Sequence, residues 1–85
     1  PMVLGVLTVY ERPGCMFCVR MRMLLEQEGI PFELHTLTDE ASKAAAKQKH
    51  GWSTFPIVVA ADGTTIGGFT EAASLHRRGQ LRPKA

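Results

Sequence analysis

The chain has 85 residues, a formal net charge of +2 and 45% hydrophobic residues. This length suffices for one domain with a thin core, so residues 1–85 are expected to form a single domain whose core spans about residues 6–81. The weak, mixed charge favours neither nucleic acid nor a membrane surface as a partner. No apolar run approaches the roughly 18 residues of a membrane span, and the short apolar start lacks the features of a signal peptide.

The predicted elements follow the order β-α-β-α-β-β-α. Strands are expected where β-branched and aromatic residues gather, and helices where apolar residues recur at helical spacing. The expected strands cover residues 6–10, 31–37, 56–61 and 64–66. The expected helices cover residues 15–28, the segment from a cap at 38 or 39 to 50, and the segment from a cap at Thr70 to about 78. A helix joins the first two strands, which should be parallel, and Asp62-Gly63 should turn a hairpin between the last two. The sequence therefore predicts an α/β fold with a four-stranded mixed sheet flanked by three helices.

The apolar residues of the second strand and of the first helix are expected to face the core. In the strand these are Phe32, Leu34 and Leu37. In the helix, the expected core or helix-filling residues, rather than a binding surface, are Met21, Met23, Leu24 and Leu25. The segment from Gln80 onward is polar and is expected to be loose.

Two cysteines, Cys15 and Cys18, stand where the first strand gives way to the first helix. A sulfur at a helix N-cap can accept hydrogen bonds from free backbone N–H groups, here those of Phe17 and Cys18, and the helix dipole favours negative charge there. With the nearby charge of Arg12, these effects are expected to lower the pKa of Cys15 below the free value of about 8.5. The pattern predicts Cys15 as the nucleophile and Cys18, within disulfide range, as the resolving thiol. The apolar Met16 and Phe17 between them should help to exclude water.

Other roles for the cysteine pair remain open. A structural staple is disfavoured because a disulfide between residues three apart closes a tiny loop and adds little stability, while two ordinary buried cysteines remain an alternative. A zinc site needs about four ligands, and only His35, His50 and His76, from three separate elements, could complete one. No metal is therefore expected. A single pair also fits a reducing, cytoplasmic compartment better than secretion.

Three motifs together make the chain resemble the glutaredoxins over nearly its whole length. They are Cys15-Met16-Phe17-Cys18, then Thr54-Phe55-Pro56, then Gly67-Gly68-Phe69-Thr70. The resemblance implies a thioredoxin-like fold. It also implies reduction of protein disulfides and glutathione mixed disulfides, with glutathione as co-substrate and no bound cofactor.

The resemblance also implies a binding groove for glutathione. Arg12 would face its glycine carboxylate, Phe17 would line the groove, and the backbone beside a cis Phe55–Pro56 bond would pair with its cysteine. Gly67 and Gly68 would lead into the helix N-terminus that receives the γ-glutamyl carboxylate. A residue before proline can offer its backbone to an extended substrate, and N–H groups at a helix start bind anions. The full set expected to bind substrate is Arg12, Phe17, Thr54, Phe55, Pro56, Gly67, Gly68, Phe69, Thr70 and Glu71.

Some residues depart from the pattern of glutathione-using members and keep two rivals open. Thr70 stands where those members usually carry Asp, and the cysteine pair lacks the usual Pro and Tyr between its members. One rival is a glutaredoxin-like redoxin that thioredoxin reductase reduces and that serves ribonucleotide reductase. The other is a dimer holding an iron–sulfur cluster through Cys15 of each chain and glutathione. The leading expectation is a monomer that uses glutathione as its electron donor.

Overall fold

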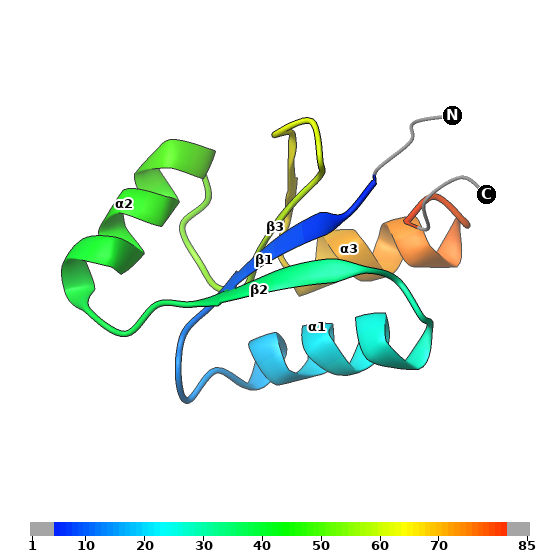
Figure 1. Cartoon of the computed structure of the whole chain (residues 1–85), viewed down its shortest axis with the longest axis horizontal. Helices are drawn as coiled ribbons and strands as arrows, with labels where there is room; N and C mark the ends of the chain where they lie inside the picture. Colours follow the sequence, from blue (N-terminus) through cyan, green and yellow to red (C-terminus); the bar gives the residue numbers. More distant parts are fainter. Residues whose placement is uncertain (1–4, 82–85) are drawn as a thin grey trace.

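The computed structural model describes residues 5–81 of the chain, and its elements follow the predicted order (Figure 1). The strands are β1 (Leu7–Glu11), β2 (Phe32–Thr36), β3 (Ile57–Val59) and β4 (Thr65–Gly67), and the helices are α1 (Met16–Gln27), α2 (Glu40–His50) and α3 (Phe69–Arg77). Within residues 5–81, no helix has the length and apolar character needed to cross a membrane.

The four strands form one mixed sheet in the order β2-β1-β3-β4. β1 runs parallel to β2, as the helical crossover between them requires, and antiparallel to β3. β3 and β4 form the predicted hairpin, in whose turn the Thr64 N–H donates to the Asp62 carboxylate across 2.9 Å. The predicted sheet is confirmed.

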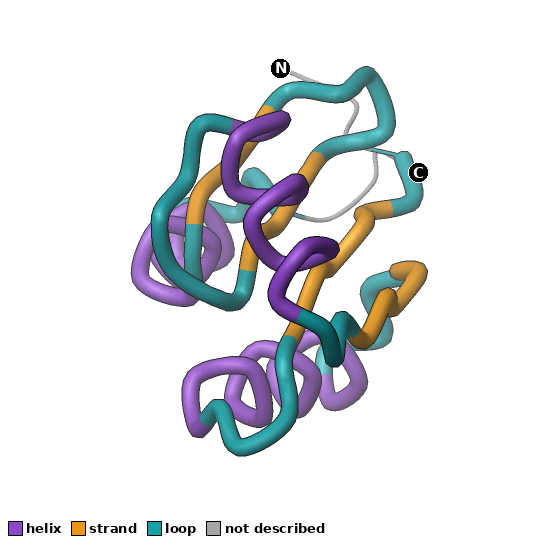
Figure 2. Tube along the Cα trace, turned by 90° about the vertical axis from the view of Figure 1, so that its left-hand side faces the viewer, coloured by secondary structure: helices purple, strands orange, loops and turns teal. Residues whose placement is uncertain are grey.

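Helices cover both faces of this sheet, as expected. α1 and α3 pack on one face, where a core cluster joins Met21, Leu25 and Ala72 to Leu7 and Val58 of the strands. α2 lies on the other face and lies nearest the viewer in Figure 2. A second cluster on that face contains Cys15, Cys18, Ala46, Phe55, Ile57 and Val59. Because side chains alternate across a strand, the short β3 supplies residues to both clusters.

The start of α3 differs from the prediction. The N-cap is Gly68 rather than Thr70, and the helix begins at Phe69. The Glu71 carboxylate accepts a hydrogen bond from the Gly68 N–H across 3.0 Å, which satisfies a backbone donor that the helix itself leaves free. β3 is also shorter than predicted, since the ladder ends at Val59.

The burial of three residues differs from what the sequence favoured. Leu34 is 40% exposed, because β2 is an edge strand that pairs with β1 alone. Met23 is 50% exposed, because the buried side of α1 is formed by Cys18, Met21 and Leu25. Leu81 lies at the end of the predicted core range but within the tail that was predicted to be loose, and it is fully buried in the core cluster that contains Leu7 and Met21.

Candidate active site

Cys15 and Cys18 form a disulfide at the start of α1, with their Cα atoms 5.2 Å apart. Cys15 is the N-cap residue, with extended backbone, as predicted. Its Sγ accepts a hydrogen bond from the Cys18 N–H across 3.2 Å. The expected hydrogen bond from the Phe17 N–H to Cys15 Sγ is not present within residues 5–81. Here the N-cap sulfur accepts from the third N–H of the helix rather than from the second. Both cysteines are buried.

The segment before β3 brings backbone polar groups to the cysteine pair. The Phe55–Pro56 peptide bond is cis, as the resemblance implies. The Phe55 carbonyl oxygen lies 3.6 Å from Cys15 Sγ, so a reduced Cys15 thiol is placed to donate a hydrogen bond to it. No described residue accepts a hydrogen bond from the Phe55 N–H. This N–H is therefore available to an extended substrate.

A groove of about 320 Å³ lies beside these groups, between the start of α1, the loop before β3 and the start of α3. Most of the residues expected to bind substrate line it, together with one further residue, Trp52. The lining consists of Phe17, Trp52, Thr54, Phe55, Pro56, Gly68, Phe69, Thr70 and Glu71. The fold thus gathers three motifs that lie far apart in the sequence.

The far wall of the groove depends on Gly67 and Gly68. Gly67 has a φ of +129°, and a Cβ there would lie 2.8 Å from Glu71 Cγ and 3.0 Å from the Trp52 ring. A Cβ on Gly68 would lie 3.3 Å from Trp52 Nε1. A side chain at Gly67 would therefore displace Glu71 or Trp52, whereas one at Gly68 would require Trp52 to shift by a few tenths of an ångström. Gly67 therefore shapes the groove from behind rather than lining it.

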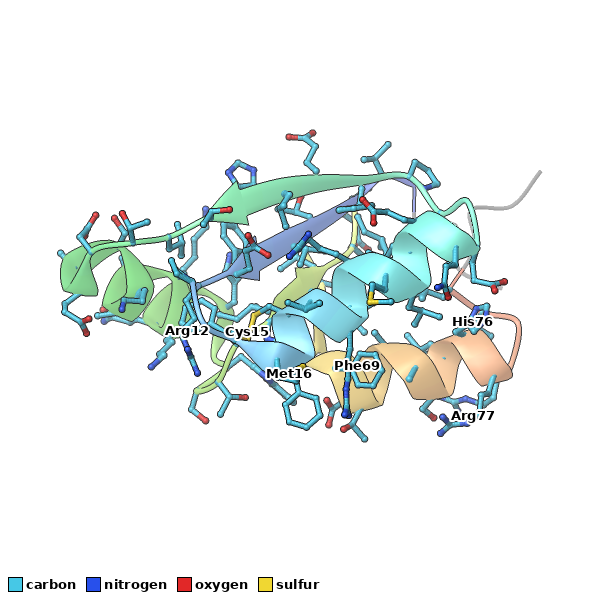
Figure 3. All side chains as sticks on the ribbon, turned by 90° about the horizontal axis from the view of Figure 1, so that it is seen from below. Arg12, Cys15, Met16, Phe69, His76 and Arg77 are labelled. Atoms are coloured by element: carbon cyan, nitrogen blue, oxygen red, sulfur yellow. A yellow bond between two sulfur atoms is a disulfide. The ribbon has the colours of Figure 1, made fainter. Side chains whose placement is uncertain are left out.

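Arg12 lies at the cysteine end of the molecule, and two further cations, Arg20 and Lys47, lie over aromatic rings of the groove. The Arg12 guanidinium donates to the Pro13 carbonyl and has no contact with either sulfur, although Figure 3 shows Arg12 and Cys15 at the same end. The Arg20 guanidinium lies 5.2 Å from the centre of the Phe17 ring, and Lys47 Nζ lies 5.5 Å from the centre of the Phe55 ring. Two cations therefore lie over the aromatic rings of two residues that line the groove, Phe17 and Phe55.

The residues expected to bind substrate did not include Trp52, Arg20 or Lys47. The one indication of Trp52 in the sequence is its position shortly before the Thr54-Phe55-Pro56 motif. Its Nε1 is buried and has no hydrogen-bond partner within residues 5–81. Arg20 and Lys47 lie outside every motif, so only their position over aromatic rings identifies them.

The histidines do not converge on the cysteines. The His35 ring stacks on Tyr10 and the His50 ring packs tilted against it, with ring centres 5.3 and 5.1 Å away. His76 Nε2 lies 3.6 Å from a Glu28 oxygen. Within residues 5–81, no group of three or more side chains is arranged to hold a metal ion.

Comparison with known sequences places the chain in one family. The model of the glutaredoxin family matches residues 7–66. A probable glutaredoxin of Synechocystis is 34% identical over 77 residues, which covers 88% of this chain and 70% of that protein. Glutaredoxin-C6 of Oryza sativa is 34% identical over 79 residues, with 88% of this chain and 70% of that protein covered.

Comparison with solved structures agrees. A buckwheat glutaredoxin–glutathione complex superposes with a TM-score of 0.72 at 31% identity, covering 88% of this chain and 71% of that one. The holo form of glutaredoxin C1 from Populus tremula x tremuloides gives a TM-score of 0.77 at 26% identity, covering 93% and 74%. The chain therefore belongs to the glutaredoxin family: it has the thioredoxin-like fold and is a thiol oxidoreductase whose redox-active pair is Cys15 and Cys18.

Proposed function

We propose that this glutaredoxin reduces protein disulfides and glutathione mixed disulfides, with glutathione as its electron donor. The observation that carries the proposal is the position of Cys15 at the open start of α1. Its sulfur accepts the Cys18 N–H there and lies beside the Phe55 backbone and the adjoining groove. A sulfur in this setting is stabilised as a thiolate, the form that attacks disulfides.

The reaction proceeds by thiol–disulfide exchange. The Cys15 thiolate attacks one sulfur of the substrate disulfide, forming a mixed disulfide with Cys15 and expelling the other sulfur as a thiolate that takes up a proton. Cys18 then loses its proton and attacks Cys15 Sγ, which releases the second substrate thiol and leaves the Cys15–Cys18 disulfide. Two molecules of glutathione return the pair to dithiols and become glutathione disulfide.

The groove supports glutathione as the donor. The Phe55 N–H and C=O can pair with the extended backbone of a peptide thiol, in the manner of a short added strand. The N–H groups of Phe69 and Thr70, at the start of α3, can receive a carboxylate at the other end of the groove. The similarity to a glutaredoxin solved as a glutathione complex adds to this support.

A second donor is favoured by one feature of the groove. The Glu71 carboxylate already accepts the Gly68 N–H and adds negative charge where a substrate carboxylate would bind. This weakens the anion site and favours a protein donor, thioredoxin reductase, over glutathione.

A comparison of donors decides between them. The oxidised chain is offered glutathione with glutathione reductase and NADPH, or thioredoxin reductase with NADPH, and NADPH oxidation is followed with a small mixed disulfide as the substrate. The proposal predicts turnover with glutathione. Turnover only with thioredoxin reductase would replace it with the second candidate.

A further inference from the structure

We propose that the outward side of α1 is a docking surface for folded, acidic protein substrates, whose mixed disulfide it presents to Cys15. The proposal rests on the proposed function and extends it from the reacting bond to the protein that carries it. The surface consists of Met16, Val19, Arg20 and Met23, and we refer to it as the α1 stripe.

The α1 stripe is an exposed apolar surface on a helix whose opposite side is already buried. Within residues 5–81, six large apolar side chains are exposed, and four of them belong to α1: Met16 at 65%, Phe17 at 51%, Val19 at 38% and Met23 at 50%. Met16, Val19 and Met23 follow the i, i+3, i+7 spacing of one helix face. Contiguous exposed apolar side chains mark interaction surfaces, and methionine adapts to varied partners.

The α1 stripe is continuous with the redox site. It begins at Met16, directly after the N-cap Cys15, and Figure 3 shows Met16 at the same end of α1 as Cys15. Phe17 connects the two surfaces, because it lines the groove and its ring lies 6.1 Å from that of Phe69. A protein whose sulfur reaches Cys15 therefore brings its neighbouring surface onto the stripe.

The charges around the α1 stripe specify an acidic partner. Arg20 lies within it, Arg12 stands at the turn before Cys15, and the first turn of α1 carries no acidic residue. The nearby Arg22 is already paired, with its Nε 2.9 Å from the Glu11 carboxylate. The charge left for a partner at the Cys15 end of the stripe is thus positive, while Glu26 lies one turn beyond Met23 at the far end. Acidic groups on the part of the partner that surrounds the reacting sulfur complement this positive end.

The test compares the same reaction, removal of glutathione from a mixed disulfide, on a small molecule and on a folded protein. Deglutathionylation is measured with the cysteine–glutathione mixed disulfide and with glutathionylated serum albumin, an acidic folded protein. The stripe variant is Val19→Gln with Met23→Gln, since Gln keeps the helix and removes the apolar surface. Val6→Gln is the matched control: Val6 is 47% exposed and precedes β1, whose other end leads to the cysteines.

The stripe variant should raise KM for the albumin substrate about five-fold or more and leave the small mixed disulfide unchanged. Arg20→Glu should raise KM for albumin by a larger factor than KM for the small mixed disulfide, Arg20→Lys should keep the wild-type ratio of the two KM values, and added salt should raise KM for albumin more than KM for the small substrate. Equal effects on both substrates, or no effect on albumin, would overturn the docking surface. Failure of the unmodified chain on the small substrate would instead overturn the proposed function.

Discussion

At the scale of single residues, the chemistry depends on the different surroundings of two cysteines. Cys15 caps α1, so its sulfur receives a backbone N–H and faces the positive end of the helix dipole. Cys18 lies one turn inside the helix, is 1% exposed and has no such access to the open end. From this geometry we propose that Cys15 attacks the substrate and Cys18 resolves the mixed disulfide.

Serine substitutions separate these two roles. Cys15→Ser removes the attacking sulfur, so all reductase activity should be lost. Cys18→Ser leaves Cys15 able to take glutathione from a mixed disulfide, so measurable activity on glutathione mixed disulfides should remain. Activity is measured with the cysteine–glutathione mixed disulfide, and an intramolecular protein disulfide serves as the contrast. An inactive Cys18→Ser beside an active Cys15→Ser would reverse the assignment.

His50 links residue-scale burial to the pH dependence of stability. Burial, and secondly the charge of Lys49, lowers the pKa of His50 below its usual 6.5. Because the unfolded chain then binds the proton more readily than the folded chain, protonation of His50 favours unfolding. The stability that depends on a neutral His50 is therefore present above about pH 6.5 and is lost as the pH falls through the lowered pKa. Its ring packs tilted against Tyr10, and within residues 5–81 its buried Nε2 has no hydrogen-bond partner.

The expected consequence is a steeper loss of stability on acidification in the wild type than in His50→Phe. Urea unfolding at about pH 7.5 and about pH 5.5 measures this difference. His35→Gln is the control, since His35 stacks on the same Tyr10 from a half-exposed position. Equal slopes in the wild type and in His50→Phe would contradict the assignment.

At the scale of elements, the local pattern of apolar and turn-forming residues predicted which segments form helices and strands. The capping residues determine where the helices begin and end. Asp39 caps α2 as expected, and Gly51 ends it in the left-handed conformation. The cap of α3 was predicted two residues too late because Thr70 is a good cap by type, whereas the side chain that satisfies the free N–H belongs to Glu71. The exposure of Leu34 was missed because strand order, not strand pattern, decides which strand lies at the edge.

The α2 cap gives an element-scale prediction. Asp39 accepts the Ser42 N–H across 2.7 Å, and this backbone hydrogen bond is the main cause of its lowered pKa. Asp39→Ala should lower the urea midpoint at neutral pH, while Asp39→Asn should retain most of the stability. The stabilising contribution of the Asp39 charge is present above the pKa that Asp39 has in the unfolded chain. It is lost as the pH falls through the lowered pKa of Asp39 in the folded chain. An Asp39→Ala midpoint equal to wild type at neutral pH would refute the cap.

At the scale of the whole molecule, the sheet brings the three motifs to one end. β1 leads into the cysteines, β3 follows the cis proline, and β4 leads into the Gly67-Gly68 turn. Their order along the chain was readable from the sequence, and so was most of the groove lining. The roles of Trp52, Arg20 and Met23 were not, because each depends on which neighbours the folded chain leaves uncovered or brings close.

A substitution at Leu81 tests whether the core extends to the end of the described residues. It is fully buried beside Leu7, Met21 and Leu25, although it follows a polar segment. Leu81→Ala should destabilise the protein by about 2–5 kcal/mol in urea unfolding, because it removes buried methyl groups and leaves a cavity. Gln80→Ala, at an exposed neighbour, should change stability by no more than about 0.5 kcal/mol. Equal, small effects would place Leu81 outside the core.

The central claim is that the start of α1 holds Cys15 as a thiolate. The most direct measurement is the pH dependence of the alkylation rate of Cys15 in the reduced Cys18→Ser variant, with the urea-unfolded variant as reference. We predict half-maximal rate at a pH clearly below the free-cysteine value of about 8.5 in the folded protein, and near that value after unfolding. The same midpoint in both states would contradict the account.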